Sequence, residues 1–173
     1  MNMCVVPAVD LHPGKPGAHE GLERRIYLHP GSLWADASAG VITTVLGSCV
    51  SVCLWDPQTA LGGINHFILP QGGGASSARY GNHALPLLLD RVLDLGAHPE
   101  TLLACVFGGA SVMAVEAVSP AVAVPTLGSR NVAEAFDFLE RNGIAVLRHD
   151  VEGRQGRKLT FRTADGTTLI RKL

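Results

Sequence analysis

A cysteine and a histidine, seventeen residues apart, are the residues of this sequence best placed to do chemistry together. Cys49 follows a Gly-Ser pair at the head of an alternating apolar run, and His66 lies in a second apolar run. A thiol beside an imidazole makes a nucleophile with its base, and a charged histidine or backbone N–H groups would lower the thiol pKa from its usual value of about 8.5. Because Gly47 and Ser48 lack bulk, their N–H groups could face a developing oxyanion.

The two apolar runs are expected to form a β-hairpin. Residues 50–55 and 64–69 are rich in the β-branched and aromatic side chains that strands favour. If residues 56–59 form the connecting loop, Cys49 lies directly opposite His66, with Cβ atoms roughly 4.5–5.5 Å apart. A bulge at the Gly-Gly pair that begins the second run would shift this register by one residue.

The simpler interpretation of Cys49 is a small buried apolar residue, as most free cysteines are. Cys53 shares the expected strand without a preceding Gly-Ser pair, and Cys105 lies in the apolar run 102–107, so both are expected in the core. The four cysteines lack the paired spacing of a zinc site, and metal binding by His12 and His19 is possible but not reinforced by any other ligand pattern.

A third member of the site is expected in the β-branched strand of residues 41–46. Either Thr43 or Thr44 could direct its hydroxyl at the imidazole and fix the histidine tautomer. Strand propensity alone would also account for both threonines.

Composition indicates a globular protein in a reducing compartment. The chain has 173 residues, 47% apolar and 17% charged, which suits one domain with a real core. A net charge of −1 gives no indication of binding to nucleic acid or to an anionic membrane. Residues 1–23, rich in proline and glycine, are expected to be a flexible leader before a domain of residues 24–173. With no spanning apolar run, a cytoplasmic location is expected.

Local patterns predict a layered α/β or α+β domain. Helical periodicity indicates a helix from Asn82 to about residue 95, and another from Ser129 or Asn131 to about residue 142. Short β-branched runs indicate seven or eight strands, the last two forming a hairpin around residues 164–166. Such alternation suits sheets flanked by the two helices.

Seven short motifs follow one another from about Ile26 to the C-terminal part of the chain. They are Tyr27-Leu28-His29-Pro30-Gly31, residues 43–50 (TTVLGSCV), residues 66–70 (HFILP), Arg79-Tyr80, residues 107–110 (FGGA), residues 128–132 (GSRNV) and Gly156-Arg157-Lys158. In this order they resemble the CheD family of chemoreceptor glutamine deamidases. One departure is Glu152, which stands where the family often has the first glycine of a Gly-Gly pair.

The resemblance implies a catalytic triad and a fold. Cys49, His66 and Thr43 match the family's catalytic residues, and Thr43 is preferred to Thr44 because it keeps the family's spacing before Gly-Ser-Cys. The implied fold is a layered single domain of mostly antiparallel sheets with two main helices. Its core would be similar to the catalytic domain of cytotoxic necrotizing factor toxins. No cofactor is implied.

The resemblance also implies partners. Family members convert glutamines of methyl-accepting chemotaxis receptors to glutamate, and many bind the CheC phosphatase. The protein would therefore meet membranes only through receptors. Two alternatives remain at this point: a non-catalytic adaptor that binds receptors or CheC, and a side activity on receptor methyl esters, which would use the same thioester chemistry.

Overall fold

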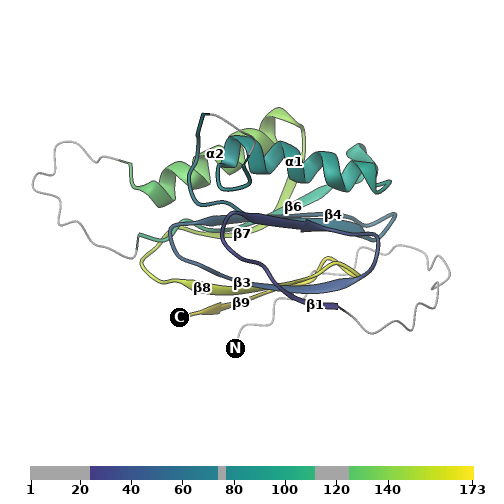
Figure 1. Cartoon of the computed structure of the whole chain (residues 1–173), viewed down its shortest axis with the longest axis horizontal. Coiled ribbons are helices and arrows are strands. Elements are labelled where there is room, and N and C mark those ends of the chain that lie inside the picture. The colour runs from purple at the N-terminus through teal and green to yellow at the C-terminus, as the bar shows by residue number, and fades with distance from the viewer. Residues whose placement is uncertain (1–23, 74–76, 112–124) are drawn as a thin grey trace, which may run out of the picture.

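The structure is a computed structural model that describes residues 24–73, 77–111 and 125–173. The expected leader of residues 1–23 lies outside these residues. In the described part, two helices, a five-stranded sheet and a four-stranded sheet are stacked as three layers (Figure 1). The expectation of a layered α+β domain with two main helices is therefore confirmed.

Both sheets are mixed, with mostly antiparallel neighbours. The four-stranded sheet has the order β1 (Arg24–Tyr27), β3 (Gly40–Leu46), β8 (Arg157–Arg162), β9 (Thr168–Lys172). The five-stranded sheet has the order β2 (Ser32–Ala35), β5 (Leu61–His66), β4 (Val50–Asp56), β6 (Leu103–Gly108), β7 (Ala145–Val151). Only the β1–β3 and β6–β7 pairings are parallel. Strand β2 is an addition to the predicted set; it has four half-buried residues and pairs only with β5.

The helices α1 (Gly81–Asp94) and α2 (Leu127–Arg141) cover the outer face of the five-stranded sheet (Figure 1). A short 3-10 turn, η1 (Pro99–Thr101), precedes β6. Both helices begin earlier than predicted. Tyr80, not Asn82, is the N-cap of α1, and Thr126 is the N-cap of α2, where its hydroxyl accepts the Ser129 N–H at 3.1 Å. Asn131 therefore lies inside α2 instead of capping it.

Strand alternation divides the apolar side chains between two cores. Val50, Val52 and Leu54 of β4 face the helices, whereas Cys53 of the same strand faces the four-stranded sheet. Cys53 is buried there, as expected, while Cys105 is only half-buried. Between the two sheets lies the second core, which contains Leu28, Ile42, Leu46, Cys53, Ile64, Phe107, Leu159 and Phe161.

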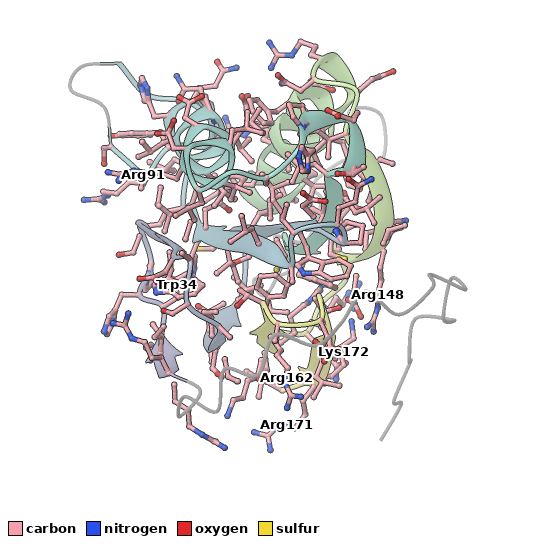
Figure 2. All side chains as sticks on the ribbon, turned by 90° about the vertical axis from the view of Figure 1, so that its right-hand side faces the viewer. Trp34, Arg91, Arg148, Arg162, Arg171 and Lys172 are labelled. Atoms are coloured by element: carbon pink, nitrogen blue, oxygen red, sulfur yellow. The ribbon has the colours of Figure 1, made fainter. Side chains whose placement is uncertain are left out.

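The outer face of the four-stranded sheet carries charged side chains as well as the exposed apolar side chains of Val45 and Leu169. Figure 2 shows Arg162 and Arg171 on the side of the molecule away from the helices. Both side chains are exposed, whereas Leu159 and Phe161 on the other face of β8 are buried. This sheet therefore contributes only its inner face to the core. No helix among the described residues is long and apolar enough to cross a membrane.

The β4–β5 hairpin has a different register from the predicted one. Asp56 pairs with Leu61, so the loop comprises residues 57–60 and each strand partner is displaced by two positions. The reason is the turn itself, because the Asp56 carboxylate accepts hydrogen bonds from the Gln58 N–H and the Thr59 hydroxyl. Its carbonyl accepts the N–H of Ala60, which has a left-handed φ of 57°. Cys49 is therefore not directly opposite His66, and the register predicted from the sequence is wrong.

Candidate active site

Cys49 and His66 nevertheless lie on the same face of the five-stranded sheet, because a displacement of two residues preserves the alternation. Val50 and Phe67 exchange two backbone hydrogen bonds, of 3.1 and 3.0 Å. This pairing sets Cys49 opposite Ile68 and His66 opposite Ser51. Cys49 and His66 are then diagonal neighbours, a relation that places residues roughly 7–8 Å apart. No hydrogen bond joins the thiol and the imidazole, but both side chains face the four-stranded sheet.

Beside His66, a side chain replaces one backbone acceptor in the hydrogen bonding between β4 and β5. The Val52 N–H donates to the side-chain Oδ1 of Asn65 at 2.9 Å, where a backbone carbonyl would normally accept. The Asn65 amide in turn donates to the Ala84 carbonyl of α1 at 3.3 Å. Asn65 is fully buried, so this carboxamide fixes the strand that carries His66 against α1.

The imidazole of His66 is held in one tautomer by Thr44. The Thr44 hydroxyl lies 2.8 Å from His66 Nδ1 and donates its single proton to the Leu28 carbonyl, also at 2.8 Å. It can therefore only accept from the ring, which places the imidazole proton on Nδ1. Nε2 is buried and has no hydrogen-bond partner among the described residues. The ring thus presents an unshared electron pair, as a general base requires.

His66 is neutral at physiological pH. It is 1% exposed, and burial lowers its pKa from 6.5 to about 4, although the Leu28 carbonyl offsets part of that shift. Without a neighbouring carboxylate, this one carbonyl does not compensate for burial of the charged imidazole. His66 is therefore available to take a proton over the whole physiological range.

The expectation of a lowered thiol pKa for Cys49 is wrong for the free protein. Burial raises the pKa of the Cys49 thiol above its ordinary value, and its own backbone N–H offsets only part of this effect. A neutral His66 supplies no positive charge to reverse the shift. The resting pair is consequently a thiol and a neutral imidazole, so a nucleophilic role for Cys49 would require transfer of the thiol proton to a base.

Thr43 does not reach the histidine. It lies on the half-buried face of β3, and its hydroxyl is 3.3 Å from the Thr160 hydroxyl on β8. Thr44, its neighbour, is fully buried and points between the sheets. The structure therefore brings Thr44, rather than Thr43, to His66.

The loop of residues 47–49 has its carbonyl groups held from one side. The Gly47 carbonyl accepts the Ala110 N–H at 2.7 Å, and the Cys49 carbonyl accepts the Gly109 N–H at 2.8 Å. The Ser48 carbonyl accepts the Asn131 amide of α2 at 2.9 Å. Apart from the Cys49 sulfur itself, no described residue accepts a hydrogen bond from the N–H of Ser48 or Cys49, so two adjacent donors are left beside the thiol.

Gly108, the last residue of β6, and Gly109 after it allow the backbone to approach the loop of residues 47–49 closely. A Cβ on Gly108 would lie 2.1 Å from the Cys49 carbonyl oxygen, and Gly108 has a φ of 116°. Gly109 likewise has a φ of 72°, and a Cβ there would lie 2.4 Å from Val132 on α2. Only glycine suits these two positions, because the loop, the end of β6 and α2 meet backbone to backbone.

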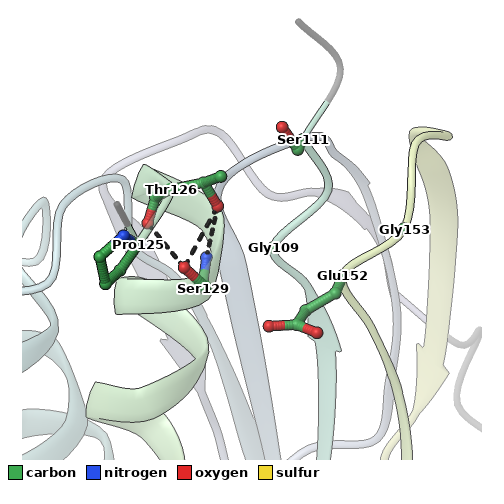
Figure 3. Close-up of a pocket in the computed structure, with 7 residues that line it drawn as sticks. All are labelled: Gly109, Ser111, Pro125, Thr126, Ser129, Glu152 and Gly153. Carbon is green, nitrogen blue, oxygen red and sulfur yellow. Dashed lines mark hydrogen bonds between the residues drawn. The ribbon is translucent and has the colours of Figure 1, made fainter. Parts of the chain in front are cut away.

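A hollow of about 320 Å³ lies behind this loop, between the start of α2 and the turn after β7. It is lined by Gly109, Ser111, Pro125, Thr126, Ser129, Glu152 and Gly153 (Figure 3). Neither Cys49 nor His66 lines it, so we do not assign it to the reacting group. Glu152 has a left-handed φ of 61° and is followed by Gly153 with a φ of 76°. This backbone conformation accounts for glycine at both places in the family motif.

Three buried polar residues of the site were missed by the sequence analysis: Ser51, Asn65 and Asn131. Each lies among apolar neighbours, on a strand or on the buried stripe of a helix. Ser51 faces His66 across the pairing, and its hydroxyl has no partner within the described part of the chain. A polar residue at a buried position of an otherwise apolar pattern was the available signal. In residues 24–73, 77–111 and 125–173, no group of three or more His, Cys, Asp or Glu side chains gathers around a possible metal site.

The fold and site define an α+β domain of three layers with a cysteine, a neutral histidine and free backbone donors at the end of its sheets. Residues 68–172 match the family model described as CheD chemotactic sensory transduction. This chain belongs to the CheD family. The matched stretch begins after Cys49 and His66, so the family match rests on other residues.

Curated relatives agree over most of the chain. A probable chemoreceptor glutamine deamidase CheD from Trichlorobacter lovleyi is 44% identical over 149 residues, which cover 85% of this chain and 89% of the relative. A probable chemoreceptor glutamine deamidase CheD 1 from Anaeromyxobacter dehalogenans is 42% identical over 168 residues, or 96% and 92% of the two chains. A probable chemoreceptor glutamine deamidase CheD from Rhodospirillum rubrum is 41% identical over 148 residues, which cover 85% of this chain and 81% of the relative.

Proposed function

We propose that this protein is a chemoreceptor glutamine deamidase in which Cys49 is the nucleophile and His66 the general base. The names of its relatives support the reaction and the class of substrate. The observation that carries the roles is the state of His66: neutral, held by Thr44 through Nδ1, and with an unpaired Nε2 on the same face as Cys49.

The first half of the reaction forms a thioester. His66 takes the thiol proton while the Cys49 sulfur attacks the carboxamide carbon of a receptor glutamine. The carbonyl oxygen becomes a tetrahedral oxyanion, which accepts hydrogen bonds from the N–H groups of Ser48 and Cys49. The carbon–nitrogen bond then breaks, and the proton held by His66 leaves with ammonia.

The second half releases the product. Water attacks the thioester carbonyl as His66 removes one of its protons, and the same two N–H groups receive the second oxyanion. The carbon–sulfur bond breaks and the thiol regains its proton from His66. The net reaction consumes one water and converts a glutamine to a glutamate with release of ammonia. Each turnover adds one negative charge to a receptor helix, and closely spaced like charges on helices repel.

We assign the orienting role to Thr44 instead of Thr43, because Thr44 is the threonine that contacts the imidazole.

The family resemblance further implies a CheC phosphatase as binding partner and a cytoplasmic location. A pull-down with purified CheC would test the first proposal, and fractionation of cells the second.

The test is incubation of a purified receptor cytoplasmic fragment with the protein, followed by mass spectrometry and an ammonia assay. Covalent catalysis by Cys49 predicts a gain of about one dalton per modified site and an equal amount of ammonia. Cys49→Ala should remove both signals and leave a folded protein that still binds the fragment. Ammonia release by Cys49→Ala would refute the role of the cysteine, and wild-type protein that binds without releasing ammonia would indicate an adaptor.

A further inference from the structure

Asn131 is a carboxamide in an apolar environment. It is fully buried on α2 and shares the buried face of that helix with Gly128, Val132, Ala135 and Leu139. Buried side chains at such positions are normally apolar, so a carboxamide there needs an explanation. Capping does not account for it, because Thr126 caps α2. Metal binding does not account for it either, because no cluster of possible metal ligands lies among the described residues.

The side chain of Asn131 joins the two segments around Cys49. Its Nδ2 donates to the Ser48 carbonyl and to the Ile68 carbonyl, at 2.9 Å in each case. Ser48 precedes Cys49, and Ile68 lies opposite Cys49 in the strand pairing. Because both neighbours are acceptors, the amino group, and not the oxygen, must point at them.

The other end of the carboxamide is left without a partner. Asn131 Oδ1 is buried and accepts no hydrogen bond from any described residue. Such an unsatisfied atom opposes folding, and an apolar side chain of similar size would avoid it. The carboxamide is therefore better explained by what its amino group does for the loop than by a gain in stability.

The geometry of one peptide unit links Asn131 to the oxyanion donor. In a planar trans peptide, the C=O of residue 48 and the N–H of residue 49 point in opposite directions. Holding the Ser48 carbonyl towards α2 therefore directs the Cys49 N–H away from α2, to the side where the thiol lies. Of the three carbonyl groups of this loop, Ser48 alone is held by a side chain; Gly47 and Cys49 use backbone donors of residues 109 and 110.

We infer that Asn131 is a positioning residue that aims the Cys49 N–H at the oxyanion of the tetrahedral intermediate. This inference rests on the proposed function, since it names the residue that orients one donor of the same site. Asn131 touches neither the substrate nor the reacting atoms. Its effect should appear in steps that develop an oxyanion and be absent from steps that do not.

Two reactions of the same thiol separate this role from a merely structural one. Deamidation of a receptor fragment passes through an oxyanion, whereas alkylation of Cys49 by iodoacetamide is a displacement at a saturated carbon and does not. Loss of one oxyanion donor lowers kcat by about 10²–10³-fold in other enzymes. For Asn131→Ala we expect kcat to fall roughly 30- to 100-fold with KM unchanged, while the alkylation rate at each pH stays within about twofold of wild type.

Asn142→Ala is the matched control. Asn142 is the C-cap of the same helix, and its amide also donates to a backbone carbonyl, that of Phe138 at 2.8 Å, but at the opposite end of α2 from the loop. The Asn142→Ala variant should deamidate the receptor fragment at the wild-type rate. Asn131→Asp, which keeps the shape and replaces the donor by an acceptor, should match Asn131→Ala in both assays.

The outcomes distinguish this inference from the proposed function. Absence of ammonia release by wild type, or its retention by Cys49→Ala, would refute the proposed function itself. An active wild type with Asn131→Ala within threefold of its kcat would overturn only the role of Asn131. A parallel fall in deamidation and alkylation, or failure of both Asn131 variants to fold, would also overturn it, because either result marks a general structural role.

Discussion

Thr43 and Thr44 are adjacent in sequence but differ in what their hydroxyl groups can do. Thr44 points between the sheets and accepts the Nδ1 proton of His66, whereas Thr43 contacts Thr160. One hydrogen bond thus decides which imidazole nitrogen is basic. The difference can be measured with isosteric variants.

Thr44→Val should lower kcat for deamidation by roughly tenfold to a hundredfold. The change removes the acceptor for His66 Nδ1 and the donor to the Leu28 carbonyl, which costs about 1–3 kcal/mol of alignment and desolvation. Thr43→Val is the matched control and should stay within threefold of wild type. A larger loss in Thr43→Val than in Thr44→Val would restore the triad suggested by the family spacing.

At this scale the sequence predicted that Cys49 and His66 share a site, and it left Thr43 and Thr44 open as partners of the imidazole until the family spacing favoured Thr43. Motif spacing favoured Thr43, while the alternation of the strand favours Thr44, because Ile42 and Leu46 are its buried neighbours at two-residue spacing. Asn131 lies within the motif of residues 128–132, but nothing in that motif indicated contact with the Cys49 loop, and Ser51 lies in no motif. The role of Asn131 depends on two backbone carbonyl groups that lie 2.9 Å away in the folded chain, and local pattern does not encode such distances.

Among the elements, the β4–β5 hairpin shows what a local pattern determines. Alternation placed Cys49 and His66 on one face, and the structure confirms that placement. The exact register depended on the turn, where the Asp56 carboxylate and the left-handed Ala60 fix the loop at residues 57–60. The Asp-Pro pair indicated a turn with such side-chain bonds, but it did not decide which residues form the loop. Propensity gave no signal for β2, which is short and pairs with one strand only.

Gly108→Ala should prevent the end of β6 from supporting the Cys49 loop. Its Cβ would lie 2.1 Å from the Cys49 carbonyl oxygen, and the position already has a φ of 116°. We expect a loss of more than about 3 kcal/mol in the free energy of unfolding, measured by urea denaturation, together with loss of deamidation.

Gly143→Ala is the control for this change. Gly143 also has a positive φ, of 66°, but nothing lies within 4 Å of the added Cβ. Only the conformational penalty of about 1–2 kcal/mol should remain, with activity retained. Equal destabilisation of the two variants would show that contact with the Cys49 loop is not what requires Gly108.

For the molecule as a whole, the position of His66 between two sheets connects catalysis to stability. The folded protein holds this ring neutral, with its pKa lowered from 6.5 to about 4 by burial. The unfolded chain therefore binds one more proton than the native state between these values, and stability must fall as the pH drops through them.

The expected loss is about 3 kcal/mol between pH 6.5 and pH 4, with stability flat above pH 6.5 as far as this group is concerned. Urea denaturation at a series of pH values would measure it. His66→Gln should flatten this window whatever its effect on the absolute stability. The buried Asp56 titrates separately: its pKa is lowered by hydrogen bonds from Thr101, His98 and Gln58, so its contribution is lost only below the ordinary aspartate range. An unchanged slope in His66→Gln would contradict the assignment.

The layered architecture was predictable because alternation and helical periodicity are properties of single segments. Which strands are neighbours was not, since β3 lies between β1 and the late strand β8. This arrangement has a consequence for synthesis on the ribosome. The strand that carries Thr44 gains its long-range neighbour only after residues 157–162 have been made. A nascent chain that already contains Cys49 therefore lacks the complete packing around the His66 imidazole. We expect no amide hydrolysis before almost the whole domain has left the ribosome.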